Sequence, residues 1–440
     1  METGSWLERA ASRAAGHTAV ETPTASWTYT ELLDAARAGA ARLREQGAGP
    51  GAPVAIALPP GLAFVQALHA CLLLGSPAVP VDPRLAPAER ERVAAGAAVR
   101  LEESLPLEGA RLEAGARHDL DATALVVHTS GTTAAPRPVE LSYGNLLWSA
   151  LGSAVALGSG PEDRWLCALP LSHVGGLSIL IRSAIYATTA VVHERFETDR
   201  ALYALREQGI TLASLVARTL ARLLDAGLER PPALRCALTG GGPVPPALRE
   251  RALGAGVPVS LTYGLTETAS QVTTLPAGAL DDAAHSAGPP LFCTGLRIAG
   301  DGEIEVSGPT VARSAALHEG WLATGDLGRV DERGWLRVLG RKADTIVTGG
   351  ENVAPAEVEA VLEAHPLVIE AAVVGRPHEE WGEMVAAWIV AEPGARIDWD
   401  ELLAHCRAQL APYKIPKDFD RTDDPLPRAA SGKLLRRELA

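Results

Sequence analysis

Three apolar runs in the first 270 residues each lead into a loop rich in glycine and hydroxyl side chains. The loops are 128–138 (His-Thr-Ser-Gly-Thr-Thr-Ala-Ala-Pro-Arg-Pro), 239–243 (Thr-Gly-Gly-Gly-Pro) and 262–268 (Thr-Tyr-Gly-Leu-Thr-Glu-Thr). Such loops can direct several backbone N–H groups and hydroxyls at one point, which suits phosphate oxygens. A single Ser/Thr/Gly cluster is more often a plain surface turn. The interpretation therefore depends on partners elsewhere in the chain.

Strand and helix patterns alternate around these loops. Buried apolar runs at 53–58 and 78–81 flank a helical pattern at 64–74, and the alternation resumes from 145 to 261. Strand, helix and strand in this order predict a parallel α/β layer. We expect the three loops to lie at strand ends of one α/β system and to converge on one crevice.

The pattern changes after about residue 288. Short runs at 296–298, 303–306 and 335–338 predict a small antiparallel β subdomain, and an α/β pattern follows Gly340-Arg341. We therefore predict an α/β protein. Residues 1–340 form a large N-terminal domain of α/β layers plus the β subdomain, and residues 341–440 form a small, mobile α+β C-terminal domain.

Composition excludes several classes of protein. The chain has 440 residues, which exceeds one ordinary domain, and 47% hydrophobic residues, which suffices for sizeable cores. The net charge of −13, with Lys and Arg dispersed, argues against nucleic-acid binding but not against a nucleotide. No apolar run reaches the roughly 18 residues of a membrane span, and the N-terminus lacks a signal core.

The five cysteines are far apart and form no CxxC pair. They are Cys71, Cys167, Cys236, Cys293 and Cys406. This spacing predicts reduced thiols in a cytoplasmic protein rather than a disulfide or zinc framework.

Seven motifs follow one another in a fixed order. They are 129–133, 169–173 (Leu-Pro-Leu-Ser-His), 240–242, 263–268, 324–327 (Thr-Gly-Asp-Leu), 340–341 and 427–433 (Pro-Arg-Ala-Ala-Ser-Gly-Lys). Their order and spacing resemble the adenylate-forming superfamily of acyl- and aryl-CoA ligases, luciferases and adenylation domains. The resemblance covers essentially the whole chain. It implies that ATP and Mg²⁺ activate a carboxylic acid as an acyl-adenylate, with release of pyrophosphate, before transfer to CoA.

The short length and three stretches, 173–186, 349–352 and 376–382, are most similar to the o-succinylbenzoate–CoA ligases of menaquinone biosynthesis. Other readings stay open. They are a ligase for another aryl or short acyl acid in secondary metabolism, an enzyme that loads a separate carrier protein, and a non-catalytic nucleotide-binding homologue. A homodimer is a candidate assembly.

The resemblance implies a nucleotide site built from most of these motifs. Its residues would be Thr129, Ser130, Gly131, Thr132, Thr133 and Arg137 for the phosphates, Gly241, Gly242 and Tyr263 for adenine, Asp326 for the ribose, Arg341 for the ribose or the phosphate, and Gly240 and Gly264 as further nucleotide contacts. A carboxylate suits the two ribose hydroxyls, and glycine lets the backbone approach a flat ring.

The resemblance also assigns the catalytic and metal-binding residues. A carboxylate is a poor nucleophile and ATP is highly anionic, so their reaction requires neutralised charge and correct alignment. Lys433, expected before a basic helix at 434–439, would bring a cation to the α-phosphate and the acyl oxygen. Thr266 would contact the α-phosphate, while Glu267 and Thr132 would hold Mg²⁺.

For the acid, the resemblance implies a pocket at the motif that ends in His173, with Ser178, Arg182 and Gly264 as further candidates. Arg182 could pair with the succinyl carboxylate or with a structural acid, and both alternatives stay open. The family's small domain swings about a hinge at Ala343 and exchanges Lys433 for the segment that would line the CoA thiol tunnel, here Gly349 and Gly350.

Two features depart from the family pattern. The hinge position is Ala343 rather than the frequent Asp or Lys, and Lys342 or Asp344 could substitute for it. The other departure is in the phosphate loop. Where the family's phosphate loop usually continues Gly-Lys-Pro-Lys-Gly, residues 134–138 are Ala-Ala-Pro-Arg-Pro. We expect a stiffer loop in which Arg137 keeps one cation, with a planar fork that is not equivalent to an ammonium group.

Overall fold

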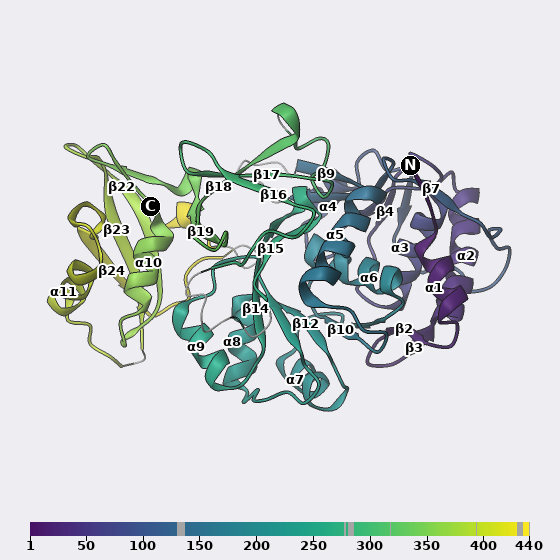
Figure 1. Cartoon of the computed structure of the whole chain (residues 1–440), viewed down its shortest axis with the longest axis horizontal. Coiled ribbons are helices and arrows are strands. Elements are labelled where there is room, and N and C mark those ends of the chain that lie inside the picture. Colours follow the sequence, from purple (N-terminus) through teal and green to yellow (C-terminus); the bar gives the residue numbers. More distant parts are fainter. Residues whose placement is uncertain are drawn as a thin grey trace.

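The computed structural model describes residues 1–129, 137–276, 279, 286–316, 318–392, 394–428 and 434–439. It is an α/β protein, as predicted, with two largely parallel sheets, a small antiparallel sheet and a C-terminal sheet. In Figure 1 the C-terminal part lies at the opposite end of the molecule from the N-terminus. Among the described residues, no helix is long and apolar enough to cross a membrane.

An eight-stranded sheet occupies the centre of the molecule, in the order β15-β14-β13-β12-β10-β11-β2-β3. Its strands are β2 (Thr18–Glu21), β3 (Ser26–Thr28), β10 (Arg164–Cys167), β11 (Thr189–Val192), β12 (Leu212–Leu215), β13 (Cys236–Thr239), β14 (Val259–Leu265) and β15 (Ser270–Thr274). The strands from β14 to β2 pair in parallel, and β15 and β3 are antiparallel edge strands. The parallel core follows from the alternation of strands and helices in the sequence.

A second sheet of five strands has the order β6-β4-β5-β8-β9. Its strands are β4 (Val54–Ile56), β5 (Ala78–Pro80), β6 (Val99–Leu101), β8 (Thr123–Thr129) and β9 (Arg137–Ser142), while β1 (Glu2–Gly4) and β7 (Arg117–Asp119) form a separate pair. The three predicted loops are divided between two sheets of the α/β protein. The first loop connects β8 and β9 of this sheet, whereas the other two belong to the eight-stranded sheet.

Helices cover both faces of the large sheet (Figure 1). They are α1 (Trp6–Arg13), α2 (Tyr29–Glu45), α3 (Leu62–Leu74), α5 (Tyr143–Leu157), α6 (Val174–Tyr186), α7 (Thr198–Glu207), α8 (Ala217–Asp225) and α9 (Pro246–Gly254). Helix α4 (Pro87–Val93) packs instead on the five-stranded sheet. Side chains alternate between faces along each strand. Trp165 and Cys167 therefore pack with α2, α3, α5 and α6 in a core shared with the five-stranded sheet, while Leu166 packs with α7, α8 and α9.

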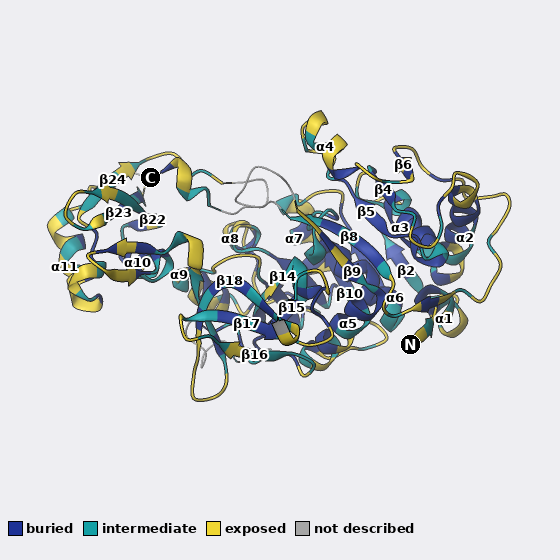
Figure 2. Cartoon of the chain, turned by 90° about the horizontal axis from the view of Figure 1, so that it is seen from above, coloured by how far each residue is buried: buried dark blue, intermediate teal, exposed yellow. Residues whose placement is uncertain are grey.

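The burial pattern agrees with this layering. Figure 2 shows buried residues concentrated in the strands and in α3, whereas α4 and α11 (Trp399–Gln409) are largely exposed. Helix α3 is buried almost throughout, which explains why its sequence is apolar on all sides. Helix α2 instead begins with a capping box, in which Thr28 and Glu31 satisfy each other's backbone N–H groups.

The predicted β subdomain is a four-stranded antiparallel sheet. Its strands are β16 (Gly295–Ile298), β17 (Glu303–Ser307), β18 (Trp321–Val330) and β19 (Leu336–Arg341). The sequence patterns did not predict β18, the longest of the four, which carries the motif at 324–327.

The C-terminal part is a mixed sheet covered by two helices. It contains β20 (Ile346–Thr348), β21 (Glu351–Val353), α10 (Pro355–Glu363), β22 (Val368–His378), β23 (Gly382–Ala391), α11 and β24 (Asp418–Thr422). The basic helix expected at 434–439 was wrong. Leu434 forms a β-bridge with Arg428, and only Arg436–Glu438 turn, as a 3₁₀ segment.

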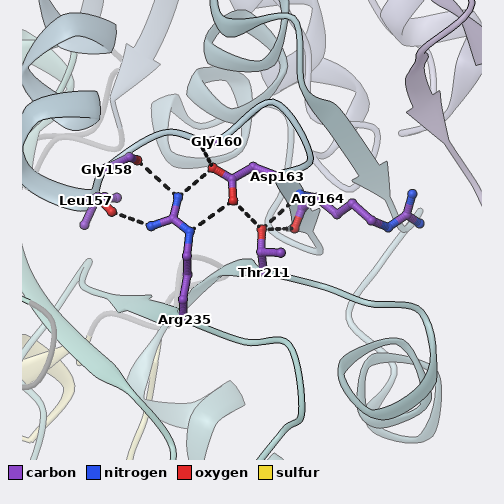
Figure 3. Close-up of polar contacts among 7 residues, drawn as sticks. All are labelled: Leu157, Gly158, Gly160, Asp163, Arg164, Thr211 and Arg235. Atoms are coloured by element: carbon purple, nitrogen blue, oxygen red, sulfur yellow. Dashed lines mark hydrogen bonds and ion pairs between the residues drawn. The ribbon is translucent and has the colours of Figure 1, made fainter.

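A buried ion pair joins the amino ends of three central strands (Figure 3). Asp163, before β10, accepts hydrogen bonds from Arg235 before β13 (Nη2 to Oδ2, 2.6 Å) and from Thr211 before β12 (2.8 Å). The Gly160 N–H adds a bond of 2.8 Å. Burial alone would raise the pKa of Asp163, but these bonds outweigh it and lower the pKa below its ordinary value. The carboxylate is therefore ionised at neutral pH.

Asp163→Ala should lower the free energy of unfolding by about 3 kcal/mol, because it leaves a half-buried Arg235 without its partner. Urea denaturation followed by circular dichroism measures this loss. Because the folded pKa of Asp163 is depressed, its stabilisation is complete above its unfolded pKa, near 4, and is lost as the pH falls through the folded value. The difference between wild type and variant should therefore shrink only below about pH 4.

Asp225→Ala is the matched control, because Asp225 forms an exposed ion pair with Arg251 and such pairs contribute less than about 1 kcal/mol. Equal losses in the two variants would contradict the role assigned to Asp163.

Candidate active site

The order of the strands defines where the large sheet can bind a ligand. From β10 the chain passes to β11 on one side, and from the adjacent β12 it passes to β13 on the other. Open α/β sheets bind ligands outside the carboxyl ends of strands at such a switch point. The segments after β10, β13 and β14 carry His173, Gly240–Gly242 and Thr266–Glu267, so these candidate residues share one edge of the sheet.

His173 lies at the start of α6, which begins three residues earlier than the pattern from Leu177 predicted. It is the N-cap residue, and its carbonyl accepts from the N–H groups of Gly176 and Leu177. Burial lowers the pKa of His173; nearby Asp82 opposes the shift and Arg84 adds to it. The ring is therefore neutral at neutral pH. A Cβ at Gly176 would lie 2.6 Å from the Pro170 carbonyl oxygen, so this packing requires glycine.

The other acid-site candidates on α6 differ in their surroundings. The buried Ser178 hydroxyl donates to the Gly175 carbonyl at 3.1 Å and is thereby satisfied within the helix. The buried Arg182 donates from Nη2 to Ser149 Oγ at 3.1 Å, and its guanidinium lies 5.6 Å from the Trp165 ring centroid. Within the described part of the chain, no Asp or Glu oxygen lies within 4.0 Å of Arg182.

Neighbouring chain segments approach so closely that several positions predicted for nucleotide binding require glycine. A Cβ at Gly240 would lie 2.7 Å from Thr262 Cγ2, and Gly241 has a φ of +80°. A Cβ at Gly264 would lie 1.7 Å from the Ser270 carbonyl oxygen. Gly264 is part of β14, where the register against β15 shifts, and not part of a loop as predicted. Gly242 has open space beside it.

The predicted ribose residues Asp326 and Arg341 meet Tyr263, which was predicted to contact adenine. The Tyr263 hydroxyl of β14 donates to Asp326 Oδ2 at 2.7 Å, and Arg341 Nε of β19 lies 2.9 Å from Asp326 Oδ1. Burial, and then the carboxylate of Asp326, raise the pKa of Tyr263, so the phenol stays a donor. A carboxylate can accept about four hydrogen bonds. These contacts orient Asp326 and are compatible with a ribose diol.

Thr266 and Glu267 form a 3₁₀ turn directly after β14. Among the described residues, no group of three His, Cys, Asp or Glu side chains could hold a metal ion. Mg²⁺ is usually bound by one or two carboxylates together with water and substrate phosphates. A single carboxylate at 267 therefore fits a metal that arrives with ATP.

The segment after Arg341, predicted to contain the hinge, has polar contacts on both sides. Lys342 Nζ lies 2.6 Å from Asp301 Oδ2 and 2.7 Å from Glu303 Oε2 of the small antiparallel sheet. Asp344 Oδ2 lies 3.0 Å from Arg436 Nη1, near the C-terminus. Lys342, before Ala343, thus bonds to the small antiparallel sheet, whereas Asp344, after it, bonds to the C-terminal part.

The remaining candidates fall into two groups. Gly349 and Gly350, with φ values of +58° and +86°, form the turn between β20 and β21. Thr129 and the exposed Arg137 end β8 and begin β9, where they are paired in register. The predictions for Ser130, Gly131, Thr132, Thr133 and Lys433 lie outside the described residues.

Sequence reasoning missed the contacts between motifs. The bonds of Asp326 to Tyr263, of Lys342 to Glu303 and of Ser172 to Asp82 (2.9 Å) each join segments far apart in the chain. Ser172 lay within a quoted motif and Asp82 directly follows a predicted strand. Their pairing, however, has no local signal.

Comparisons with known proteins identify the family. The model of the AMP-binding enzyme family matches residues 7–102 and 96–314, and that of its C-terminal domain matches residues 357–433. The chain belongs to the AMP-binding enzyme family. It is 38% identical over 477 residues to a 2-succinylbenzoate–CoA ligase from Bacillus subtilis (strain 168), and 39% identical over 478 residues to one from Bacillus velezensis. Each alignment covers 100% of this chain and 98% of the relative.

Solved structures of the o-succinylbenzoate CoA synthetase from Bacillus subtilis give the same family. The complex with the acyl-adenylate intermediate OSB-AMP matches with a TM-score of 0.91 at 37% identity, over 100% of this chain and 98% of that one. The complex with ATP and magnesium ion scores 0.90 at 37% identity, over 100% of both chains. A double mutant bound to the product analogue OSB-NCoA scores 0.74 at 37% identity, over 100% of this chain and 98% of that one.

Tyr263→Phe should raise the KM for ATP about tenfold, because it removes a hydrogen bond to a buried carboxylate while keeping the ring. An ATP titration of pyrophosphate release measures this effect. Tyr203→Phe, at an exposed tyrosine, is the control and should leave the KM unchanged. An unchanged KM in Tyr263→Phe would show that orientation of Asp326 does not limit nucleotide binding.

Proposed function

We propose that this protein is an ATP-dependent CoA ligase for o-succinylbenzoate. It adenylates the carboxylic acid, releases pyrophosphate and transfers the acyl group to the thiol of CoA, as a step of menaquinone biosynthesis. The observation that carries the proposal is the full-length similarity to 2-succinylbenzoate–CoA ligases at 38% identity. The converging residues around Asp326 supply the chemistry that such a reaction needs.

The nucleotide would lie along the carboxyl edge of the large sheet. Asp326, oriented by Tyr263 and Arg341, binds the ribose hydroxyls, while the close backbone at Gly240 and Gly241 borders adenine. Thr129 and Arg137 flank the phosphate loop, and Glu267 holds Mg²⁺, which neutralises phosphate charge when bound.

The acid would lie between the start of α6 and the turn after β14. His173, neutral because of burial, adds no charge to this pocket. Arg182 supports the choice of acid. It is a buried cation that donates a hydrogen bond to Ser149, whose hydroxyl in turn donates to the Ala269 carbonyl beside Thr266–Glu267. A buried cation favours an anionic partner. The second carboxylate of a dicarboxylic substrate would provide one.

We further propose that residues 1–340 and 341–440 are separate domains and that the second one moves. Lys433 acts in adenylation, and rotation near Ala343 then replaces it with Gly349 and Gly350 at the CoA tunnel. The scores against the Bacillus subtilis enzyme support this proposal. This chain has the same sequence identity to the OSB-AMP and OSB-NCoA complexes and the same coverage of both. Its TM-score is nevertheless 0.91 against the first and 0.74 against the second. The arrangement in Figure 1 thus resembles that of the adenylate complex.

A cytoplasmic location and a homodimer complete the proposal. All five cysteines are free, which suits a reducing compartment.

A panel of carboxylic acids tests the substrate. Pyrophosphate release with and without CoA should be fastest with o-succinylbenzoate, and Arg182→Met should raise the KM for this acid about tenfold or more while leaving that for benzoate unchanged. Turnover of benzoate-type acids without turnover of o-succinylbenzoate would refute the substrate. Absence of pyrophosphate with every acid would refute the ligase activity.

Lys433→Ala should slow adenylation roughly 100- to 1,000-fold, because a cation that stabilises the transition state is lost. Thioester formation from supplied acyl-adenylate and CoA should remain close to wild type. Rapid-quench measurement of each half-reaction separates the two effects. Arg437→Ala, at an exposed neighbouring cation, is the control. Equal loss of both half-reactions would contradict the exchange of Lys433 for the glycine turn.

A further inference from the structure

Two loops from different sheets meet beside His173. Asp82 lies at the carboxyl end of β5 in the five-stranded sheet, two residues after the strand ends. Ser172 follows β10 of the eight-stranded sheet and directly precedes His173. The Ser172 hydroxyl donates to Asp82 Oδ2 at 2.9 Å. This bond fixes the end of the β10 loop against the other sheet, at the residue next to the histidine.

Arg84 holds the carboxylate of Asp82 in turn. Its backbone N–H and Nε each donate to Oδ1 at 2.9 Å, and its Nη2 donates to Oδ2 at 2.6 Å. The Asp82 side chain is only 11% exposed, whereas that of Arg84 is 53% exposed. The Asp82 carboxylate thus lies between the two loops, and the Arg84 guanidinium shields it from the solvent. Burial would raise the pKa of Asp82, but the bonds from Arg84 and Ser172 outweigh it and lower the pKa to about 2.

The two charges act on the His173 ring with opposite signs. Asp82 favours the protonated ring and Arg84 disfavours it, so their effects partly cancel and burial decides that the ring is neutral. On the helix that His173 caps, the only charged residue is Arg182, more than two turns further along. Asp82 and Arg84, on the neighbouring loop, are the charged groups that act on this ring.

We propose that Asp82 and Arg84 are positioning residues for His173, which fix its loop through Ser172 and place two opposite charges near its ring. The proposal rests on the proposed function, in which His173 lines the acyl pocket. A neutral imidazole offers one donor and one acceptor nitrogen without adding charge where a carboxylate and then a thiol must enter. Loss of either partner leaves a single charge beside the ring, and loss of the Ser172 bond frees the loop.

Opposite changes at the two charges test the electrostatic part. Asp82→Asn keeps an acceptor oxygen but leaves the charge of Arg84 unbalanced, so the pKa of His173 should fall. Arg84→Gln leaves the carboxylate unbalanced, so that pKa should rise. We expect each shift to be about half a unit or more, measured by NMR of isotope-labelled histidine with His173→Gln for assignment. Arg90→Gln, at an exposed arginine of α4, is the control and should cause no shift.

Ser172→Ala tests the positioning part without changing any charge. It should lower kcat for thioester formation about tenfold, the effect of one lost hydrogen bond to a charged group. The KM for ATP should remain unchanged, and Ser172→Thr, which keeps the hydroxyl, should restore the rate.

Shifts of the same sign in Asp82→Asn and Arg84→Gln, or no shift in either, would overturn the inference. So would an unchanged kcat in Ser172→Ala. The NMR measurement needs no turnover, so a wild-type enzyme inactive with every acid would refute the proposed function separately. Because Arg84 is exposed, the Arg84→Gln measurement decides the question even where Asp82→Asn fails to fold.

Discussion

The carboxylate of Asp326 is the point at which three segments of the molecule meet. Tyr263 reaches it from the last parallel strand of the large sheet, Arg341 reaches it from the end of the small antiparallel sheet, and Arg341 also directly precedes the predicted hinge. A buried carboxylate is costly unless it is paired and hydrogen-bonded. The same contacts that satisfy Asp326 therefore set the distance between the large sheet and the start of the C-terminal part. The candidate nucleotide site and the origin of the C-terminal part are thus positioned by the same carboxylate.

Sequence patterns predicted the elements of this fold well but not their assembly. Apolar runs bounded by glycine and proline are local features, so β4, α3 and β5 were expected where they occur. Strand order is set by long-range packing, so the division of the first loop and the two later ones between two sheets had no local signal. Tyr263 and Gly264 were expected in a loop because glycine favours turns. The antiparallel pairing with β15, which only glycine can accommodate so closely, makes them part of a strand.

The candidate site shows the same division. Residue types at Asp326, Glu267 and Arg182 suggested candidate roles, because a family motif or a lone cation in an apolar helix is visible in the sequence. The hydrogen-bond partners in and around the site were not visible. Ser149 bonds to Arg182, Asp82 to Ser172 and Glu303 to Lys342, and hydroxyl and carboxylate side chains have many ordinary roles. Such partners follow from the tertiary fold alone.

The Asp163 network lies at the amino ends of β10, β12 and β13, whereas every candidate ligand contact from these strands lies at their carboxyl ends. The amino and carboxyl edges of the sheet are joined by these strands. Among the contacts described above, no side chain belongs to both the Asp163 network and the candidate site. Changes at distant sites without common partners usually combine additively. Stabilising substitutions around Asp163 can therefore offset the destabilisation that new pocket residues cause. Because the two regions are separate, substitutions that change the acid specificity can accumulate at one edge of the sheet while the network at the other edge maintains stability.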